Sequence, residues 1–166
     1  MCALAEVQDG QTILEPEAGS GAILDYLTEH FNDVSCMAYE VNHSLFEVVK
    51  GVHSCVQHVD FLTVEPAEVA DRVLMNPPFE KLQDIDHVQH AFKFLKPGGK
   101  LVAIMSPSAL FRKDKKAQAF RAWLAEHIGH EQDLPEGSFK ASGTSVNTKI
   151  VVIEKPMVTG SNITVH

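Results

Sequence analysis

The sequence predicts a doubly wound α/β fold, in which a mostly parallel sheet carries helices on both faces. Short apolar runs alternate along the chain with amphipathic stretches, which is the pattern of strand–helix–strand units. The length of 166 residues is typical of one domain. The composition, with 45% apolar and 22% charged residues, is that of an ordinary globular protein.

The apolar runs predict the strands, since charged or turn-forming residues bound them. These strands are expected at residues 12–14, 34–39, 54–59, 72–75, 100–105 and 149–154. Apolar residues at helical spacing predict helices at residues 22–31, 45–50, 84–94 and 115–128, and residues 1–7 hold the end of another. The segment Lys-Pro-Gly-Gly at 96–99 is expected to stop the third of these helices before the fifth strand begins.

Composition excludes several classes of protein. No apolar run approaches the roughly 18 to 20 residues of a membrane span, and no signal peptide opens the chain, so we expect a cytoplasmic protein with no membrane partner. The three cysteines form no CxxC motif, which favours buried thiols in a reducing compartment over disulfides or a zinc site. The net charge of −8 argues against tight autonomous binding to nucleic acid.

Acidic residues and glycines follow successive predicted strands, at the edge of the sheet where ligands of this fold class bind. The first strand leads into Glu-Pro-Glu-Ala-Gly-Ser-Gly at 15–21, the second into Glu40, and the third into Asp60-Phe61. Carboxylates at the glycine loop repel a pyrophosphate and suit a ligand with an amino group, and Leu24 replaces the third glycine of the dinucleotide fingerprint.

Each of these acids has a chemical use at its place. Glu40 can accept the two hydroxyls of a ribose, and Asp60 can accept from an adenine amino group with Phe61 against the ring. A single acid of this kind is more often a solvated strand end or a helix cap. Their occurrence on successive strands is what favours a ligand site.

The fourth strand ends in Asn76-Pro77-Pro78-Phe79. Proline fixes its own φ and holds the preceding residue extended, so the Asn76 amide and the Pro77 carbonyl are two fixed acceptors for one NH2 group. Phe79 adds a flat face for a ring. Two acceptors on a conjugated amine free its lone pair for attack, so this motif indicates chemistry on an amino group by positioning and electrostatics. A rigid turn before a helix is the plainer reading of the two prolines alone.

Together these motifs resemble class I S-adenosylmethionine-dependent methyltransferases of the amino-methylating group, whose members carry (D/N)PP(Y/F), and most of all the DNA adenine-N6 methyltransferases of bacteria and phages. The resemblance covers nearly all of residues 12–155. It implies a Rossmann-like methyltransferase fold with a late antiparallel hairpin, S-adenosylmethionine as cofactor, and adenine N6 in DNA as the methyl acceptor. The implied catalytic residues are Asn76, Pro77, Pro78 and Phe79, and the implied cofactor-binding residues are Glu15, Ala18, Gly19, Gly21, Glu40, Val41, Asp60, Phe61 and Asn76.

The resemblance also implies how a nucleic acid partner is held. Base flipping is required to expose the amino group of a duplex base, and Phe139 is the candidate to stack on that base; a core phenylalanine is an equal alternative. Five of the fourteen basic residues form a basic segment within ten positions, namely Arg112, Lys113, Lys115, Lys116 and Arg121. We expect Lys113, Lys115 and Lys116 to hold phosphates beside the pocket, although a solvated helix face is the usual role of one charge run.

Other substrates and roles stay open. RNA bases and protein glutamine are alternative acceptors, and a truncated, non-catalytic module that holds cofactor or a partner is an alternative function. We expect a single catalytic domain over residues 1–155 and a loose tail over 156–166. The domain is expected to lack a full N-terminal helix and a target-recognition domain. We therefore expect a protein partner to supply target recognition. The pairs His87/His90 and His127/His130 are expected to be exposed helix residues rather than metal ligands.

Overall fold

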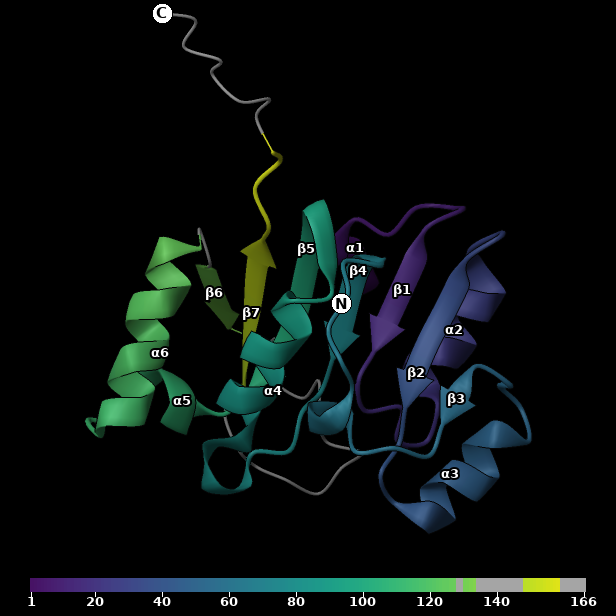
Figure 1. The fold of residues 1–166 in the computed structure, drawn as a ribbon, viewed down its shortest axis with the longest axis horizontal. Coiled ribbons are helices and arrows are strands. Elements are labelled where there is room, and N and C mark those ends of the chain that lie inside the picture. The colour runs from purple at the N-terminus through teal and green to yellow at the C-terminus, as the bar shows by residue number, and fades with distance from the viewer. Residues whose placement is uncertain (128–129, 134–147, 159–166) are drawn as a thin grey trace, which may run out of the picture.

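The computed structural model describes residues 1–127, 130–133 and 148–158, which form one sheet with helices on both faces (Figure 1). The strand order is β3-β2-β1-β4-β5-β7-β6. The strands are β1 Thr12–Glu15, β2 Ser35–Tyr39, β3 Val56–Gln57, β4 Ala70–Met75, β5 Leu95–Met105, β6 His130–Asp133 and β7 Lys149–Glu154. The predicted doubly wound architecture is confirmed.

The strands from β3 to β5 run parallel, and β7 runs antiparallel to both β5 and β6. The antiparallel end of the predicted fold is therefore also confirmed. Strand β1 lies between β2 and β4. The chain first forms β2 and β3 on one side of β1, and then returns to form β4 and β5 on the other side. The carboxyl ends of β1 and β4 form the switch point at which open α/β sheets bind their ligands.

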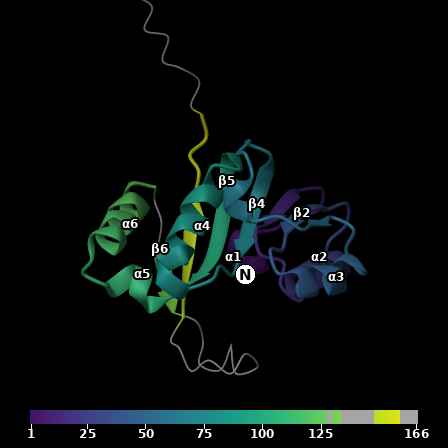
Figure 2. The ribbon, with the colours of Figure 1, turned by 60° about the horizontal axis from the view of Figure 1, so that its bottom comes forward.

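The helices are α1 Cys2–Ala5, α2 Ala22–His30, α3 His43–Lys50, α4 Gln83–Phe92, α5 Pro107–Phe111 and α6 Lys115–Glu126, with 3-10 turns η1 Phe61–Thr63 and η2 Glu80–Leu82. Helices α4, α5 and α6 cover one face of the sheet, where they share a core cluster with β4, β5 and β7. Helices α1 and α2 pack on the opposite face, and α3 packs with α2 against β2 and β3 (Figure 2).

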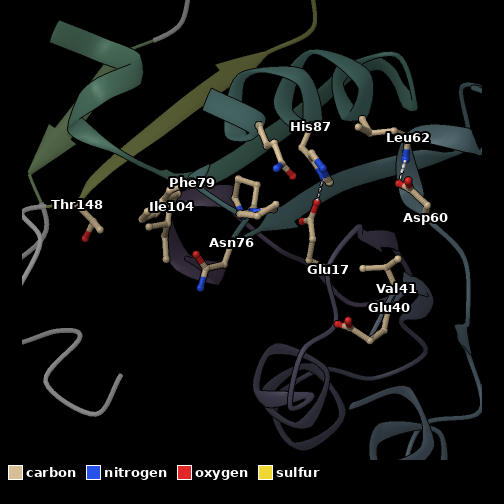
Figure 3. Close-up of a pocket in the computed structure, with 13 residues that line it drawn as sticks. Glu17, Glu40, Val41, Asp60, Leu62, Asn76, Phe79, His87, Ile104 and Thr148 are labelled. Atoms are coloured by element: carbon tan, nitrogen blue, oxygen red, sulfur yellow. Dashed lines mark hydrogen bonds and ion pairs between the residues drawn. The ribbon is translucent and has the colours of Figure 1, made fainter. Parts of the chain in front are cut away.

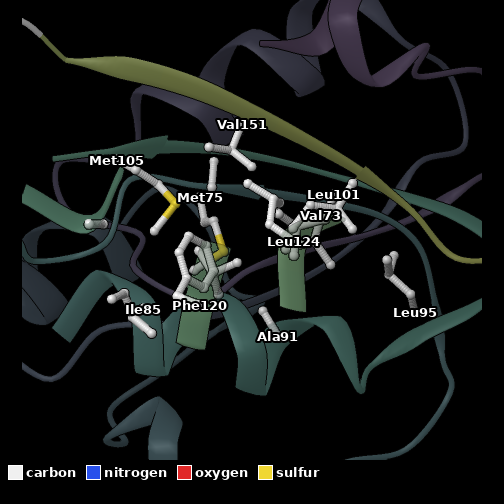
Figure 4. Close-up of a cluster of buried hydrophobic side chains, with 14 of the residues drawn as sticks. Val73, Met75, Ile85, Ala91, Leu95, Leu101, Met105, Phe120, Leu124 and Val151 are labelled. Carbon is white, nitrogen blue, oxygen red and sulfur yellow. The ribbon is translucent and has the colours of Figure 1, made fainter. Parts of the chain in front are cut away.

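Successive apolar side chains of the central strands point to opposite faces of the sheet, which explains why both faces of the sheet are buried. Val73 and Met75 of β4 point into the cluster beneath α4 and α6 (Figure 4), whereas Leu74 between them points to the α1–α2 face. In β5, Leu101 and Val102 divide between the two faces in the same way. Each such side chain contributes roughly 1.5–3 kcal/mol on full burial. The core thus fixes the register of β4, and with it the position of the residues that follow Met75.

Several elements differ from the sequence-based expectation. β3 is restricted to two residues, because it pairs with β2 only at Ala38 and Tyr39. The segment at 96–99 belongs to the long strand β5, whose pairing with β4 shifts register between Ala70 and Arg72. Neither α5 nor β6 was predicted. The short helix at the N-terminus is confirmed, and residues 156–158 have no regular structure. Within the described residues, no helix is long and apolar enough to cross a membrane.

Candidate active site

A cavity of about 670 Å³ opens at the carboxyl ends of β1, β2 and β4 (Figure 3). It brings together residues from the glycine loop, from the ends of β2 and β4, and from α4. The lining residues are Glu17, Glu40, Val41, Asp60, Leu62, Asn76, Pro77, Pro78, Phe79, Gln83, His87, Ile104 and Thr148. The four residues of the Asn-Pro-Pro-Phe motif therefore face the same space as Glu40 and Asp60, as the strand order predicts.

The loop between β1 and α2 turns on two glycines in left-handed conformations, Gly19 with φ +55° and Gly21 with φ +87°. A Cβ on Gly19 would meet no atom within 4 Å, whereas a Cβ on Gly21 would lie 2.9 Å from Cγ2 of Val49. Gly21 is thus required by the close approach of α3, and Gly19 leaves open space over the loop. The Ala18 N–H donates to the Tyr39 carbonyl at 2.8 Å, which fastens the loop to the end of β2.

Glu40 is 6% exposed, and two backbone groups orient its carboxylate. Oε2 accepts from the Gly19 N–H at 2.8 Å, and Oε1 accepts from the Asn42 N–H at 2.8 Å. Each carboxylate oxygen keeps a further acceptor site after these bonds. Glu40 is therefore a fixed, buried acceptor pair at the wall of the cavity.

Glu15 ends β1 and is only 2% exposed. Its Oε2 is buried and has no hydrogen-bond partner among the described residues. Burial, followed by the nearby charge of Glu17, raises the pKa of Glu15 well above its ordinary value. Glu15 is not among the residues that line the cavity, so the structure places it behind the wall formed by the loop.

Asp60 lines the cavity, whereas the side chain of the next residue, Phe61, lies in the core. Asp60 caps the 3-10 turn η1 by accepting from the Leu62 N–H at 3.0 Å, and it lines the cavity. The Phe61 ring is 2% exposed and packs 5.7 Å from Tyr39 and 5.2 Å from Phe94, measured between ring centroids. The exposed apolar side chains of Leu62 and Val41 line the cavity instead.

The Asn-Pro-Pro-Phe motif leaves β4 where the buried strand ends at Met75. Asn76 is exposed, and its side chain makes no hydrogen bond with the part of the chain that the structure describes. Pro77 is buried and Phe79 is half-buried, and the chain then turns through positive φ angles at Lys81 and Leu82 into α4. The motif thus presents an amide with free acceptor and donor sites at the mouth of the cavity.

Two contacts of α4 at the site were not predicted. Asp84 is fully buried and accepts from the N–H and the hydroxyl of Ser106, which joins the start of α4 to the end of β5. His87 is in hydrogen-bond contact with Glu17 and is 7% exposed, so its expected exposure is wrong. His90 and His127 are half-buried, which also departs from that expectation. The described residues hold no group of three or more His, Cys, Asp or Glu side chains that could bind a metal.

The basic segment begins directly after α5, on the side of the sheet formed by β7 and β6 (Figure 2). Lys113 and Lys115 are exposed. Lys116 instead forms an ion pair with Asp86 at 2.6 Å, and Arg112 pairs with Asp114 at 2.8 Å. Phe139 and residue 128 lie outside the described residues.

Comparison with solved structures identifies the fold. A protein from Listeria monocytogenes, described as a class I S-adenosylmethionine-dependent methyltransferase, superposes with a TM-score of 0.71 at 16% identity over 96% of this chain and 58% of its own. The chain has the class I methyltransferase fold. TrmN from Thermus thermophilus superposes with a TM-score of 0.65 at 17% identity, covering 93% of this chain and 46% of its own. No family model and no curated protein sequence matches the chain.

The chain spans 58% and 46% of the lengths of these two neighbours. The same fold also occurs in the [4+2]-cyclase SpnF, with a TM-score of 0.66 at 12% identity over 94% of this chain and 78% of that one. Because a cyclase shares the fold, the fold alone does not determine the reaction. The reaction has to be inferred from the residues of the cavity.

Proposed function

We propose that this chain binds S-adenosylmethionine and transfers its methyl group to an exocyclic amino group, with adenine N6 in DNA as the acceptor. The observation that carries the proposal is the Asn76-Pro77-Pro78-Phe79 motif, which lines the same cavity as the fixed carboxylate of Glu40. One end of the cavity suits a nucleoside, and the other end suits an amine.

The residues present fit the cofactor. Glu40 is placed to accept the ribose hydroxyls, because backbone N–H groups already fix its carboxylate. Asp60 would accept from the adenine amino group, with Val41 and Leu62 against the ring. The open space over Gly19 leaves room for the amino acid end, and Glu15, whose Oε2 is buried without a partner in the described chain, is assigned to this end by the resemblance of the loop motif. We include Ala18, Gly21 and Phe61 as residues that shape this site.

The chemistry at the acceptor end follows from Asn76 and Pro77. S-adenosylmethionine, when bound, supplies an electrophilic methyl group. The Asn76 Oδ1 and the Pro77 carbonyl would each accept one N–H of the target amine, which draws the nitrogen toward tetrahedral geometry and frees its lone pair. Phe79 would stack on the ring that carries the amine. These groups act by position and charge, and the extra proton leaves the nitrogen after the methyl group has been transferred.

DNA is the acceptor we favour because the motif suits a conjugated amine and an exposed basic segment lies near the end of β5. Lys113 and Lys115 are exposed for phosphate contacts. The total charge of −8 leaves room for a basic protein partner that supplies target recognition. RNA bases and protein glutamine carry the same kind of amine and are the other acceptors to be tested.

The test is transfer of a labelled methyl group from S-adenosylmethionine to DNA, RNA and protein in parallel. We expect label in DNA as N6-methyladenine, lost in Asn76→Ala and retained in Asn32→Ala, an exposed asparagine outside the cavity. Label in RNA or protein would support the same mechanism of methyl transfer with a different acceptor from DNA. Cofactor binding without transfer to any acceptor would favour a non-catalytic binding module.

A further inference from the structure

The cavity wall is strongly acidic. Glu17, Glu40 and Asp60 line it, and His87 is the single lining group that can carry a positive charge; no described lysine or arginine lines it. Glu40 accepts from the backbone N–H groups of Gly19 and Asn42, and Asp60 accepts from the Leu62 N–H. Glu17 is different, because its contacts join the glycine loop to α4 across 70 positions of sequence.

The connectivity of the cofactor determines which of its groups lies nearest to Glu17. In S-adenosylmethionine one sulfur atom carries both the transferable methyl group and the ribosyl group. The methyl group must face Asn76, and the ribose must reach Glu40, so the sulfur has to lie between these two residues. Glu17 projects into the cavity from between them in the view of Figure 3.

We propose that Glu17, held in place by His87, is the counter-ion of the cofactor sulfonium, so that the site prefers the cationic cofactor over the uncharged thioether product. The inference rests on the proposed function, because it assumes the same cofactor. The product, S-adenosylhomocysteine, keeps the ribose, the adenine and the amino acid end, and the sulfonium charge is what it lacks. A carboxylate beside the sulfur therefore distinguishes the two ligands, whereas a carboxylate on the ribose does not.

The surroundings of Glu17 make this interaction effective. Its side chain is 18% exposed, and its Oε2 is buried without a hydrogen-bond partner within the described chain. Oε1 is in hydrogen-bond contact with Nδ1 of His87, whose side chain is 9% exposed. Burial raises the pKa of Glu17, and the contact with His87 opposes that rise, so His87 both orients the carboxylate and favours its charged form. Limited solvent access strengthens the attraction between this carboxylate and an opposite charge. A purely structural tie between the loop and α4 would support both ligands equally.

The experiment measures the dissociation constants of S-adenosylmethionine and S-adenosylhomocysteine by calorimetry, and takes their ratio. We expect the wild type to bind the cationic ligand on the order of tenfold more tightly than the thioether. Glu17→Gln keeps the shape and removes the charge, so the ratio should fall to about one, through loss of affinity for the cationic ligand. Glu40→Gln is the matched control, and it should weaken both ligands and leave the ratio unchanged.

Two variants test the positioning role of His87. His87→Asn keeps a nitrogen donor near the place of Nδ1 and should retain the ratio, whereas His87→Leu should lower it. Equal affinity of the wild type for the two ligands would overturn the proposal without any variant. An unchanged ratio in folded Glu17→Gln, checked by circular dichroism, would also overturn it. If the wild type binds neither ligand, the proposed function itself has failed.

Discussion

The carboxylate of Asp84 accepts two hydrogen bonds from Ser106, from the backbone N–H at 2.9 Å and from the hydroxyl at 2.7 Å. Asp84 is fully buried and lies in the first turn of α4, while Ser106 follows β5 and caps α5. The pair therefore fastens the helix that follows the Asn-Pro-Pro-Phe motif to the neighbouring strand. This contact holds the acceptor side of the cavity in place.

We expect Asp84→Ala to lower the free energy of unfolding by about 3 kcal/mol, because it leaves two buried donors of Ser106 without an acceptor. Chemical denaturation measures this change. The matched control is Asp86→Ala on the same helix, which removes an exposed ion pair with Lys116 and should cost about 0.5 kcal/mol or less. Equal losses in the two variants would contradict the role of Asp84.

The buried Glu15 should make stability depend on pH. Its folded pKa lies well above the ordinary value of 4.5, chiefly because of burial. The unfolded chain loses this proton near pH 4.5 while the folded chain keeps it, so the contribution of Glu15 to stability is present below 4.5 and is lost as the pH rises through the folded pKa.

We therefore expect Glu15→Gln to gain stability relative to the wild type as the pH rises above 4.5, the ordinary pKa of the group. Urea denaturation at several pH values measures this difference, with the exposed Glu29→Gln as the control. The same variant should bind S-adenosylmethionine more weakly if Glu15 contacts the cofactor. A stability difference that stays flat across this pH range would contradict the raised pKa.

The two glycines of the cofactor loop should respond differently to alanine. Both have positive φ, and alanine there costs about 1 kcal/mol of backbone strain. At Gly21 the new Cβ also meets Val49 at 2.9 Å, so Gly21→Ala should lose more stability than Gly19→Ala. Adding Val49→Ala should relieve the clash without relieving the strain. Gly19→Ala should chiefly weaken cofactor binding, which titration measures, and the reverse order of stabilities would refute this account of the loop.

The exposed lysines of the basic segment should set the salt dependence of DNA binding. Lys115→Glu should weaken binding and reduce the slope of log affinity against log salt by about one, because one phosphate contact is lost. Lys116→Glu should have a smaller effect, since Asp86 already neutralises Lys116. Lys50→Glu on α3 is the control of equal charge change. Identical salt slopes for Lys115→Glu and the wild type would show that the basic segment does not contact DNA.

The sequence was sufficient to predict six of the seven strands of the described sheet, but not β6. Alternation of apolar residues and the order of helices and strands determine a doubly wound sheet, and such a sheet brings Glu40, Asp60 and Asn76 to one edge. The extent of β3 was not predictable, because its partner strand limits it to two residues. α5 has only five residues, too few for a periodic pattern.

The contacts across the cavity could not be predicted from local sequence patterns either. Glu17 and His87 are 70 positions apart, and no spacing rule connects them. His87 sits among Asp84, Asp86 and His90, which gives the local appearance of a solvated helix face. The structure turns one side of that face inward, where Asp84 meets Ser106 and His87 meets Glu17. The proposed role of Phe61 in ring stacking stays a prediction, and its ring lies in the core.

The most direct test of the central claim is the rate of methyl transfer to an adenine-containing DNA strand, followed by nucleoside analysis, for the wild type and Asn76→Ala. Removing one preorganised acceptor of this kind should slow transfer by roughly 10²- to 10³-fold. We expect N6-methyladenine from the wild type, such a loss in the variant, and only slightly weakened cofactor affinity. Equal rates in the two proteins, or no methylated base from a wild type that binds the cofactor, would contradict the account.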